Sequence, residues 1–167
     1  MWSAASVLVC VLDVLGRSAG TFPPIVLLDV RPPEVSSQAE AFVRSGDETI
    51  YLITVSSTFQ SARRSTNKCA NYDALRKLAS VLVHEEWHIR HGRDERGAYA
   101  AQLTTLRALS TGPGNPVYAE VIRSMRAALA ADPGRSVHLS AEQADWRGQP
   151  ARAASARLHT EPTATNR

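Results

Sequence analysis

The first half of the chain carries short apolar runs that are separated by turn-forming residues. The apolar run at residues 25–30 lies between two proline pairs, which is typical of a short strand. Residues 41–43 and 49–55 flank the polar, glycine-containing segment 45–48, and this arrangement predicts a β-hairpin. We therefore expect a small, mostly antiparallel sheet of about three strands in the N-terminal half.

In the second half of the chain, apolar positions recur at the spacing of helices. Asn71 or Asp73 can cap the first of these helices, and Gly92 can end it. Residues 78–83 are apolar on nearly all sides of the predicted helix. We therefore expect this helix to be buried.

Two further helices are predicted after Gly92. Asp94 is suited to cap a helix that the Gly-Pro-Gly segment 112–114 would end. Asn115 followed by Pro116 predicts the start of another helix, which the Pro-Gly pair at 133–134 would end. The whole pattern predicts an α+β fold, with a small antiparallel sheet followed by about three helices.

The two ends of the chain differ from its middle. Residues 1–20 contain an apolar run that Asp13 interrupts and no basic residue precedes, so a signal peptide and a first helix both remain open. Localisation, in the cytoplasm or by export, is left open with them. Residues 21–139 form the expected domain, and residues 140–167 have little periodicity and are expected to be disordered. No stable membrane span is expected.

Composition limits the classes of protein further. With 167 residues the chain is long enough for one domain with a substantial core. Only two of its 19 basic residues are lysines, and the arginines are spread along the whole chain, which argues against a nucleic-acid partner. Cys10 and Cys69 form neither a disulfide framework nor a metal-binding spacing, so we expect two small, buried or half-buried residues and leave the redox compartment open.

The strongest chemical signal is the segment His84-Glu85-Glu86-Trp87-His88, which lies in the predicted buried helix. Residues four apart share one face of a helix, so His84 and His88 can bind one metal ion with Glu85 beside them. Ionisable side chains on an apolar helix are costly to bury without a partner, and a metal ion removes that cost. Zinc hydrolases hold their metal in this way.

A third ligand is expected just beyond the end of this helix. Glu95 ranks first, because a turn at Gly92 can bring the first turn of the next helix back to the metal. His91 ranks second, since three ligands on one helix would strain a tetrahedral site. Asp94 ranks third, because helix capping explains it better.

Neighbouring residues can be assigned from the same helical spacing. Glu95, Tyr99 and Gln102 fall on one face of the second helix, so a Glu95 ligand would bring the other two toward the site. Glu86 points away from Glu85, and we expect it to have a structural or supporting role. Trp87 is expected to contribute packing rather than substrate contact.

These residues carry a family resemblance. The His-Glu-Glu-Trp-His motif at 84–88, Gly92 and the Glu-Arg-Gly-Ala-Tyr sequence at 95–99 together resemble zincin metallopeptidases, especially the gluzincin-like group. In that group a glutamate on the following helix is the third zinc ligand. The gap between His88 and Glu95 is shorter here than in the larger gluzincins, and the metzincin spacing is missing.

The resemblance implies a Zn²⁺-dependent peptidase that acts on a peptide or protein substrate. Its ligands would be His84, His88 and Glu95, and Glu85 would be the general base that transfers the proton of the attacking water. Tyr99 or His91 would stabilise the developing oxyanion.

Two other interpretations remain. A non-catalytic scaffold could keep the zinc site for stability, and a metal-free helical module could use the histidines as core or surface groups. Zincins bind extended peptides along an exposed strand edge, and residues 49–55 are the predicted edge strand. An exposed edge would favour the peptidase, whereas a covered edge would favour the scaffold. Oligomeric state is left open.

Overall fold

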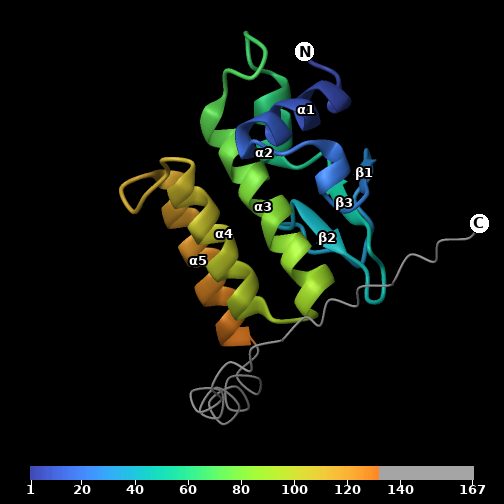
Figure 1. Ribbon diagram of the computed structural model, residues 1–167, viewed down its shortest axis with the longest axis vertical. Coiled ribbons are helices and arrows are strands. Elements are labelled where there is room, and N and C mark those ends of the chain that lie inside the picture. Colours follow the sequence, from blue (N-terminus) through green and yellow to red (C-terminus); the bar gives the residue numbers. More distant parts are fainter. Residues whose placement is uncertain (132–167) are drawn as a thin grey trace, which may run out of the picture. The chain divides into compact units, whose positions relative to one another are not determined.

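A three-stranded sheet and five α-helices make up residues 1–131, the part of the chain that the computed structural model describes (Figure 1). In chain order the elements are α1 (Ala4–Leu15), the short 3₁₀ helix η1 (Ala19–Thr21), β1 (Ile25–Leu28), β2 (Ala41–Val43), β3 (Ile50–Ile53), α2 (Ser57–Arg63), α3 (Tyr72–His91), α4 (Glu95–Ala108) and α5 (Pro116–Ala131). The expected α+β class is confirmed. The predicted helix end at 133–134 and the predicted tail at 140–167 lie outside the described residues.

The sheet has the strand order β1-β3-β2, so β3 is central. Strands β2 and β3 form the expected antiparallel hairpin, in which Phe42 lies opposite Tyr51. Strand β1 instead runs parallel to β3, with Val26 opposite Tyr51. The sheet is therefore mixed rather than mostly antiparallel. The chain leaves β1 and builds β2 on the far side of β3 before it returns, so no tight turn joins β1 to its neighbour.

Helix α3 lies at the centre of the described region, between the sheet with α1 on one side and α4 on the other (Figure 1). Leu78 and Leu82 are fully buried and Leu75 nearly so, which confirms the expected burial of this helix. The Asn71 side chain caps it by accepting a hydrogen bond from the Ala74 amide, and Gly92 ends it. Both predicted helix limits are therefore confirmed.

The N-terminal segment, left open between a leader and a helix, forms helix α1. One side of this helix belongs to the main hydrophobic core, with Val7, Val11 and Leu12 at 5% exposure or less. Within residues 1–131 no helix combines the length and the apolar character that crossing a membrane requires.

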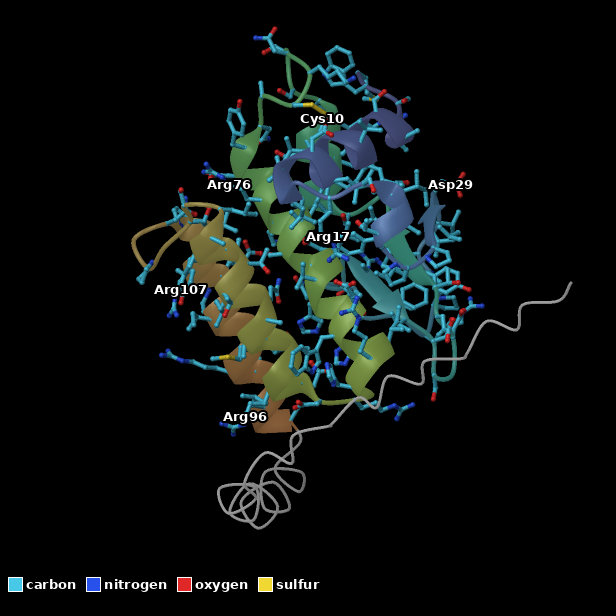
Figure 2. The ribbon with its side chains drawn as sticks, viewed as in Figure 1. Cys10, Arg17, Asp29, Arg76, Arg96 and Arg107 are labelled. Atoms are coloured by element: carbon cyan, nitrogen blue, oxygen red, sulfur yellow. A yellow bond between two sulfur atoms is a disulfide. The ribbon has the colours of Figure 1, made fainter. Side chains whose placement is uncertain are left out.

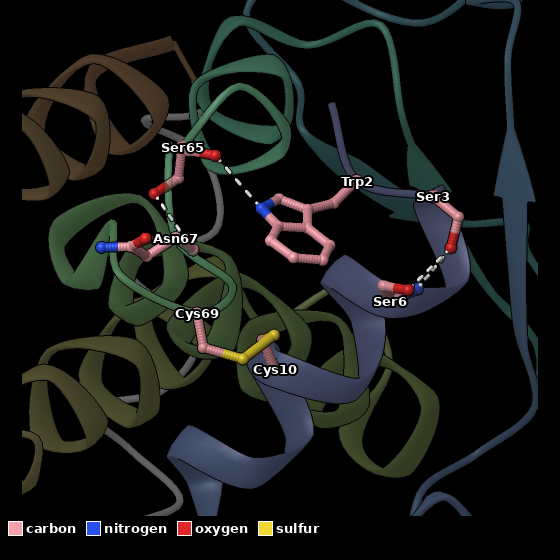
Figure 3. The surroundings of a disulfide bond; sticks show 7 residues. All are labelled: Trp2, Ser3, Ser6, Cys10, Ser65, Asn67 and Cys69. Carbon is pink, nitrogen blue, oxygen red and sulfur yellow. Dashed lines mark hydrogen bonds between the residues drawn. A yellow bond between two sulfur atoms is a disulfide. The ribbon is translucent and has the colours of Figure 1, made fainter.

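Cys10 is buried and Cys69 half-buried, as expected, but the two cysteines also form a disulfide that was not expected (Figure 3). The bond joins α1 to the segment before α3, and the Cα atoms lie 5.4 Å apart although 59 positions separate the residues in sequence. Next to the bond, the Trp2 indole donates a hydrogen bond to the Ser65 carbonyl at 3.1 Å. The pairing follows from the packing of α1 across this segment, which the spacing of the cysteines does not encode.

The sequence pattern also misses helix α2. Its seven residues are rich in serine and threonine, which have modest helix propensity. The Ser56 side chain caps the helix, and Phe59 anchors it with a fully buried ring. Tertiary packing therefore stabilises a helix that local propensity does not predict.

Candidate metal centre

Two helices and the short turn between them bring three potential metal ligands together. His84 and His88 lie one turn apart on α3, and their Nε2 atoms are 3.1 Å apart. Gly92 has a φ of 68°, which favours glycine, and the chain then turns back into α4. Glu95, in the first turn of α4, places Oε2 3.6 Å from the His84 Nε2 and Oε1 3.5 Å from the His88 Nε2.

The separations of these donors fit a single ion of the size of zinc. Ligands at about 2.0–2.2 Å from a tetrahedral zinc ion lie about 3.3–3.6 Å from one another. The two separations from the Glu95 carboxylate, 3.5 and 3.6 Å, lie within that range, and the separation of 3.1 Å between the two imidazole nitrogens is slightly shorter. Two imidazole nitrogens and a carboxylate oxygen are also a donor set typical of catalytic zinc sites, which leave one position open.

Hydrogen bonding and packing orient the two imidazoles. The His88 Nδ1 lies 2.8 Å from the Gly92 carbonyl oxygen. Because a carbonyl can only accept, Nδ1 carries the proton and Nε2 keeps the lone pair that a metal needs. The His84 Nδ1 is buried and has no hydrogen-bond partner among the described residues, so this ring is oriented by its edge-to-face contact with the Tyr99 ring at 4.6 Å.

Glu85 lies beside the three potential ligands and is nearly inaccessible, with 8% of its surface exposed. Burial raises the pKa of its carboxyl group to about 7. The charge of His84 lowers this pKa, the charge of Glu95 raises it, and a hydrogen bond from the Val43 amide lowers it. In the metal-free chain this carboxyl group therefore changes protonation near neutral pH.

A cleft of about 420 Å³ opens at this site between residues 36–41, α3, α4 and α5. Its walls include the side chains of His84, Glu85, Glu95, Tyr99 and Gln102. The expected common face of Glu95, Tyr99 and Gln102 is thus turned toward the site. Burial and the carboxylates of Glu95 and Glu85 raise the pKa of Tyr99, so its hydroxyl group stays protonated and can donate a hydrogen bond.

The other two ligand candidates lie elsewhere. The ring of His91 is exposed and stacks on Trp87 with 4.1 Å between the ring centroids, outside the group of three donors and outside the cleft wall. Its position therefore does not support a role as ligand or oxyanion group. Asp94 caps α4 by accepting a hydrogen bond from the Gly97 amide at 3.0 Å, as expected from the sequence.

Glu86 has the structural role expected for it. Its buried carboxylate receives two hydrogen bonds from Arg17, at 2.6 and 2.9 Å, and one from Arg90 at 2.6 Å. Arg17 follows α1 and lies beside α3 (Figure 2), so this ion pair joins the N-terminal helix to the motif. No local pattern singles out Arg17, because its partner is 69 residues away in sequence.

The expected peptide-binding edge at residues 49–55 is wrong. Strand β3 is paired on both sides and offers no free edge. Strand β2 is the outer strand on the side of the cleft, and residues 39–41 contribute to the cleft wall. The sequence pattern predicts the hairpin but not the strand order of the sheet, because a hairpin alone does not show which of its two strands pairs with a third strand.

The chain matches no protein-family model, no curated protein and no solved structure. The resemblance to zincins is therefore carried by the motif residues themselves. Their geometry describes a site that can hold a metal ion next to a buried carboxyl group and an open cleft.

Proposed function

We propose that this chain is a zinc-dependent hydrolase of the zincin type that cleaves peptide bonds. One observation carries the proposal: the donor atoms of His84, His88 and Glu95 converge at separations that suit one Zn²⁺ ion. Glu85 adds a carboxyl group at the same place, on the wall of a cleft that a substrate can enter.

The proposed reaction divides the work among these residues. Zinc held by His84, His88 and Glu95 would supply Lewis acidity, which polarises a substrate carbonyl and lowers the pKa of the attacking water toward neutrality. Glu85 accepts the proton of the attacking water and later passes it to the leaving amine. The Tyr99 hydroxyl group stays protonated at neutral pH and lines the cleft, which supports a role as hydrogen-bond donor to the developing oxyanion.

A peptide substrate in extended conformation fits the surroundings of the site. Strand β2 is the outer strand of the sheet next to α3, and residues 39–41 line the cleft. Extended peptides commonly bind along such edges through main-chain hydrogen bonds. Peptide hydrolysis is therefore favoured over hydrolysis of a compact small molecule.

The decisive experiment separates metal binding from catalysis. Elemental analysis of the purified chain should show about one zinc per molecule, and His84→Ala should remove it. Glu85→Gln should keep the zinc and abolish cleavage of a mixed peptide library followed by mass spectrometry. Glu48→Gln is the matched control, since Glu48 is exposed and lies outside the cleft wall. Retained zinc in His84→Ala, or cleavage by Glu85→Gln, would refute the assigned roles.

A non-catalytic zinc protein is the second candidate. The covered edges of β3 favour it, as the sequence criterion states, and so does the short length of β2. The strand has only three residues, and the Val43 amide is already bonded to Glu85. Little free edge is then left for a substrate. In that case the wild-type chain would hold zinc and lose stability on chelation, while the peptide library would stay uncut.

A further inference from the structure

A cluster of charged side chains lies on the cleft wall away from the three ligands. Lys77 on α3 places its ammonium group 2.7 Å from the Glu40 Oε1 and 2.7 Å from the Glu120 Oε1. The hydroxyl group of Thr58 lies 3.1 Å from the same ammonium group and donates a hydrogen bond to Glu40. Lys77, Glu40 and Glu120 all belong to the cleft wall that also contains His84.

The charges of this cluster do not balance. Burial alone would lower the pKa of Lys77, but the neighbouring carboxylates of Glu40 and Glu120 outweigh it, so that the pKa is raised. The ammonium group is therefore charged at neutral pH and neutralises one of the two carboxylates. One negative charge remains at this end of the cleft.

Glu40 provides a second and independent observation. Only 8% of this residue is exposed, and its Oε1 is engaged by Lys77 and Thr58. Its Oε2 is buried and has no hydrogen-bond partner among the described residues. An unsatisfied buried carboxylate oxygen is costly, and a cationic donor in the cleft would remove that cost when the carboxylate turns toward it.

We propose that this end of the cleft is a subsite that selects substrates by a positive charge, either a guanidinium or an ammonium group. Glu40 and Glu120 are its specificity-determining residues, and Lys77 positions Glu40. This proposal extends the proposed peptidase function and rests on it where the bound molecule is called a substrate. Binding of a cationic group to the subsite does not itself require hydrolysis.

The distance along α3 indicates which substrate groups can reach the subsite. Lys77 precedes His84 by seven positions, which corresponds to about 10 Å of helix. Extended peptide covers that distance in about three residues. An arginine or lysine side chain near the cleaved bond, or a free N-terminal ammonium group a few residues away, would therefore meet Glu40 and Glu120.

Three small probes distinguish these sources when they are titrated into the zinc-loaded full chain by NMR. N-acetyl-arginine amide carries a cationic side chain, citrulline amide carries only a cationic α-amine, and N-acetyl-citrulline amide has the same shape without charge. At least one cationic probe should bind about tenfold more tightly than the neutral probe, which is the size expected for one charge-assisted hydrogen bond. The tighter of the two cationic probes identifies the source of the charge.

Glu40→Gln and Glu120→Gln should each abolish this preference, while Glu48→Gln should keep it. If Glu40→Gln fails to fold, Glu120→Gln decides alone, because that side chain is 48% exposed and its loss should be tolerated. The subsite proposal would be overturned if all three probes bound equally well. It would also be overturned if the Glu120→Gln variant still preferred the cationic probes. Failure of the peptidase proposal would appear differently, as a lack of cleavage with the charge preference intact.

Discussion

The indole of Trp87 lies against the backbone of Gly97, so close that a Cβ atom at residue 97 would be 2.6 Å from two of the ring carbons. Trp87 lies between the two proposed histidine ligands in sequence, and Gly97 lies two residues after Glu95, the third proposed ligand. This contact therefore sets how closely the first turn of α4 approaches α3, and with it the distance from the carboxylate to the imidazoles.

Gly97→Ala is expected to weaken zinc binding. Alanine favours a helix over glycine by about 1 kcal/mol, but the overlap with the Asp94 carboxylate and with the Trp87 ring forces these side chains or the α4 backbone to move. We expect a loss of roughly tenfold or more in zinc affinity, as is usual when the support of a ligand is disturbed. Competition with a chelating dye measures it. Gly114→Ala is the control, because a Cβ atom there meets nothing within 4 Å; equal zinc affinity in both variants would contradict the prediction.

Arg17→Ala should destabilise the fold. It removes two of the three hydrogen bonds to the Glu86 carboxylate, of which only 7% is exposed. Loss of one partner of a buried ion pair costs about 3–5 kcal/mol; since Arg17 is partly exposed and Arg90 remains, we expect about 2 kcal/mol. Urea denaturation measures the loss. The exposed Arg123→Ala should change little, and Arg17→Ala combined with Glu86→Gln should recover part of the stability.

Reduction of the Cys10–Cys69 bond should lower the free energy of unfolding by about 2–4 kcal/mol, because the bond restricts a long segment of the unfolded chain. Denaturation of the oxidised and reduced chain, and of the double alanine variant, measures the difference. Zinc content should be unchanged, since neither cysteine contacts the ligands. Coincident denaturation curves would mean that the bond contributes nothing to stability.

Burial of Glu85 should make the stability of the metal-free chain depend on pH. Its pKa is about 7 in the folded chain and 4.5 in the unfolded chain, so the unfolded state loses its proton first as pH rises. The contribution of Glu85 to the free energy of unfolding is therefore fully present below pH 4.5. It decreases by roughly 3 kcal/mol as the pH rises to about 7. Glu85→Gln should remove this decrease in chelator-treated protein. A wild-type chain and variant with the same pH profile would show that Glu85 does not titrate in this range.

The features that sequence predicted are those that local signals determine. The limits of α3 follow from a cap at Asn71 and a glycine at 92, and the start of α4 follows from Asp94. The position of Glu95 beside the two histidines follows for the same reason, since a tight turn and helical spacing determine where its side chain points. Caps and periodicity need no knowledge of the rest of the fold.

The features that sequence missed depend on contacts between distant segments. The pairing of Cys10 with Cys69, the parallel alignment of β1 with β3 and the bond from Arg17 to Glu86 each join residues that nothing in their local sequence relates. The cluster of Lys77 with Glu40 and Glu120 is of the same kind. Side-chain chemistry alone cannot single out such residues, because most glutamates and lysines are surface groups.

The turn from α3 to α4 also has a consequence for how the protein is assembled. The three donors lie within one helical hairpin, so a metal ion that binds them closes only a short loop, at a small cost in chain entropy. The cleft, in contrast, also needs residues 36–41, which precede the hairpin in sequence, and α5, which follows it. Contacts between near neighbours form faster than distant ones. We therefore expect a bound metal ion to stabilise this hairpin even when the cleft is not yet complete.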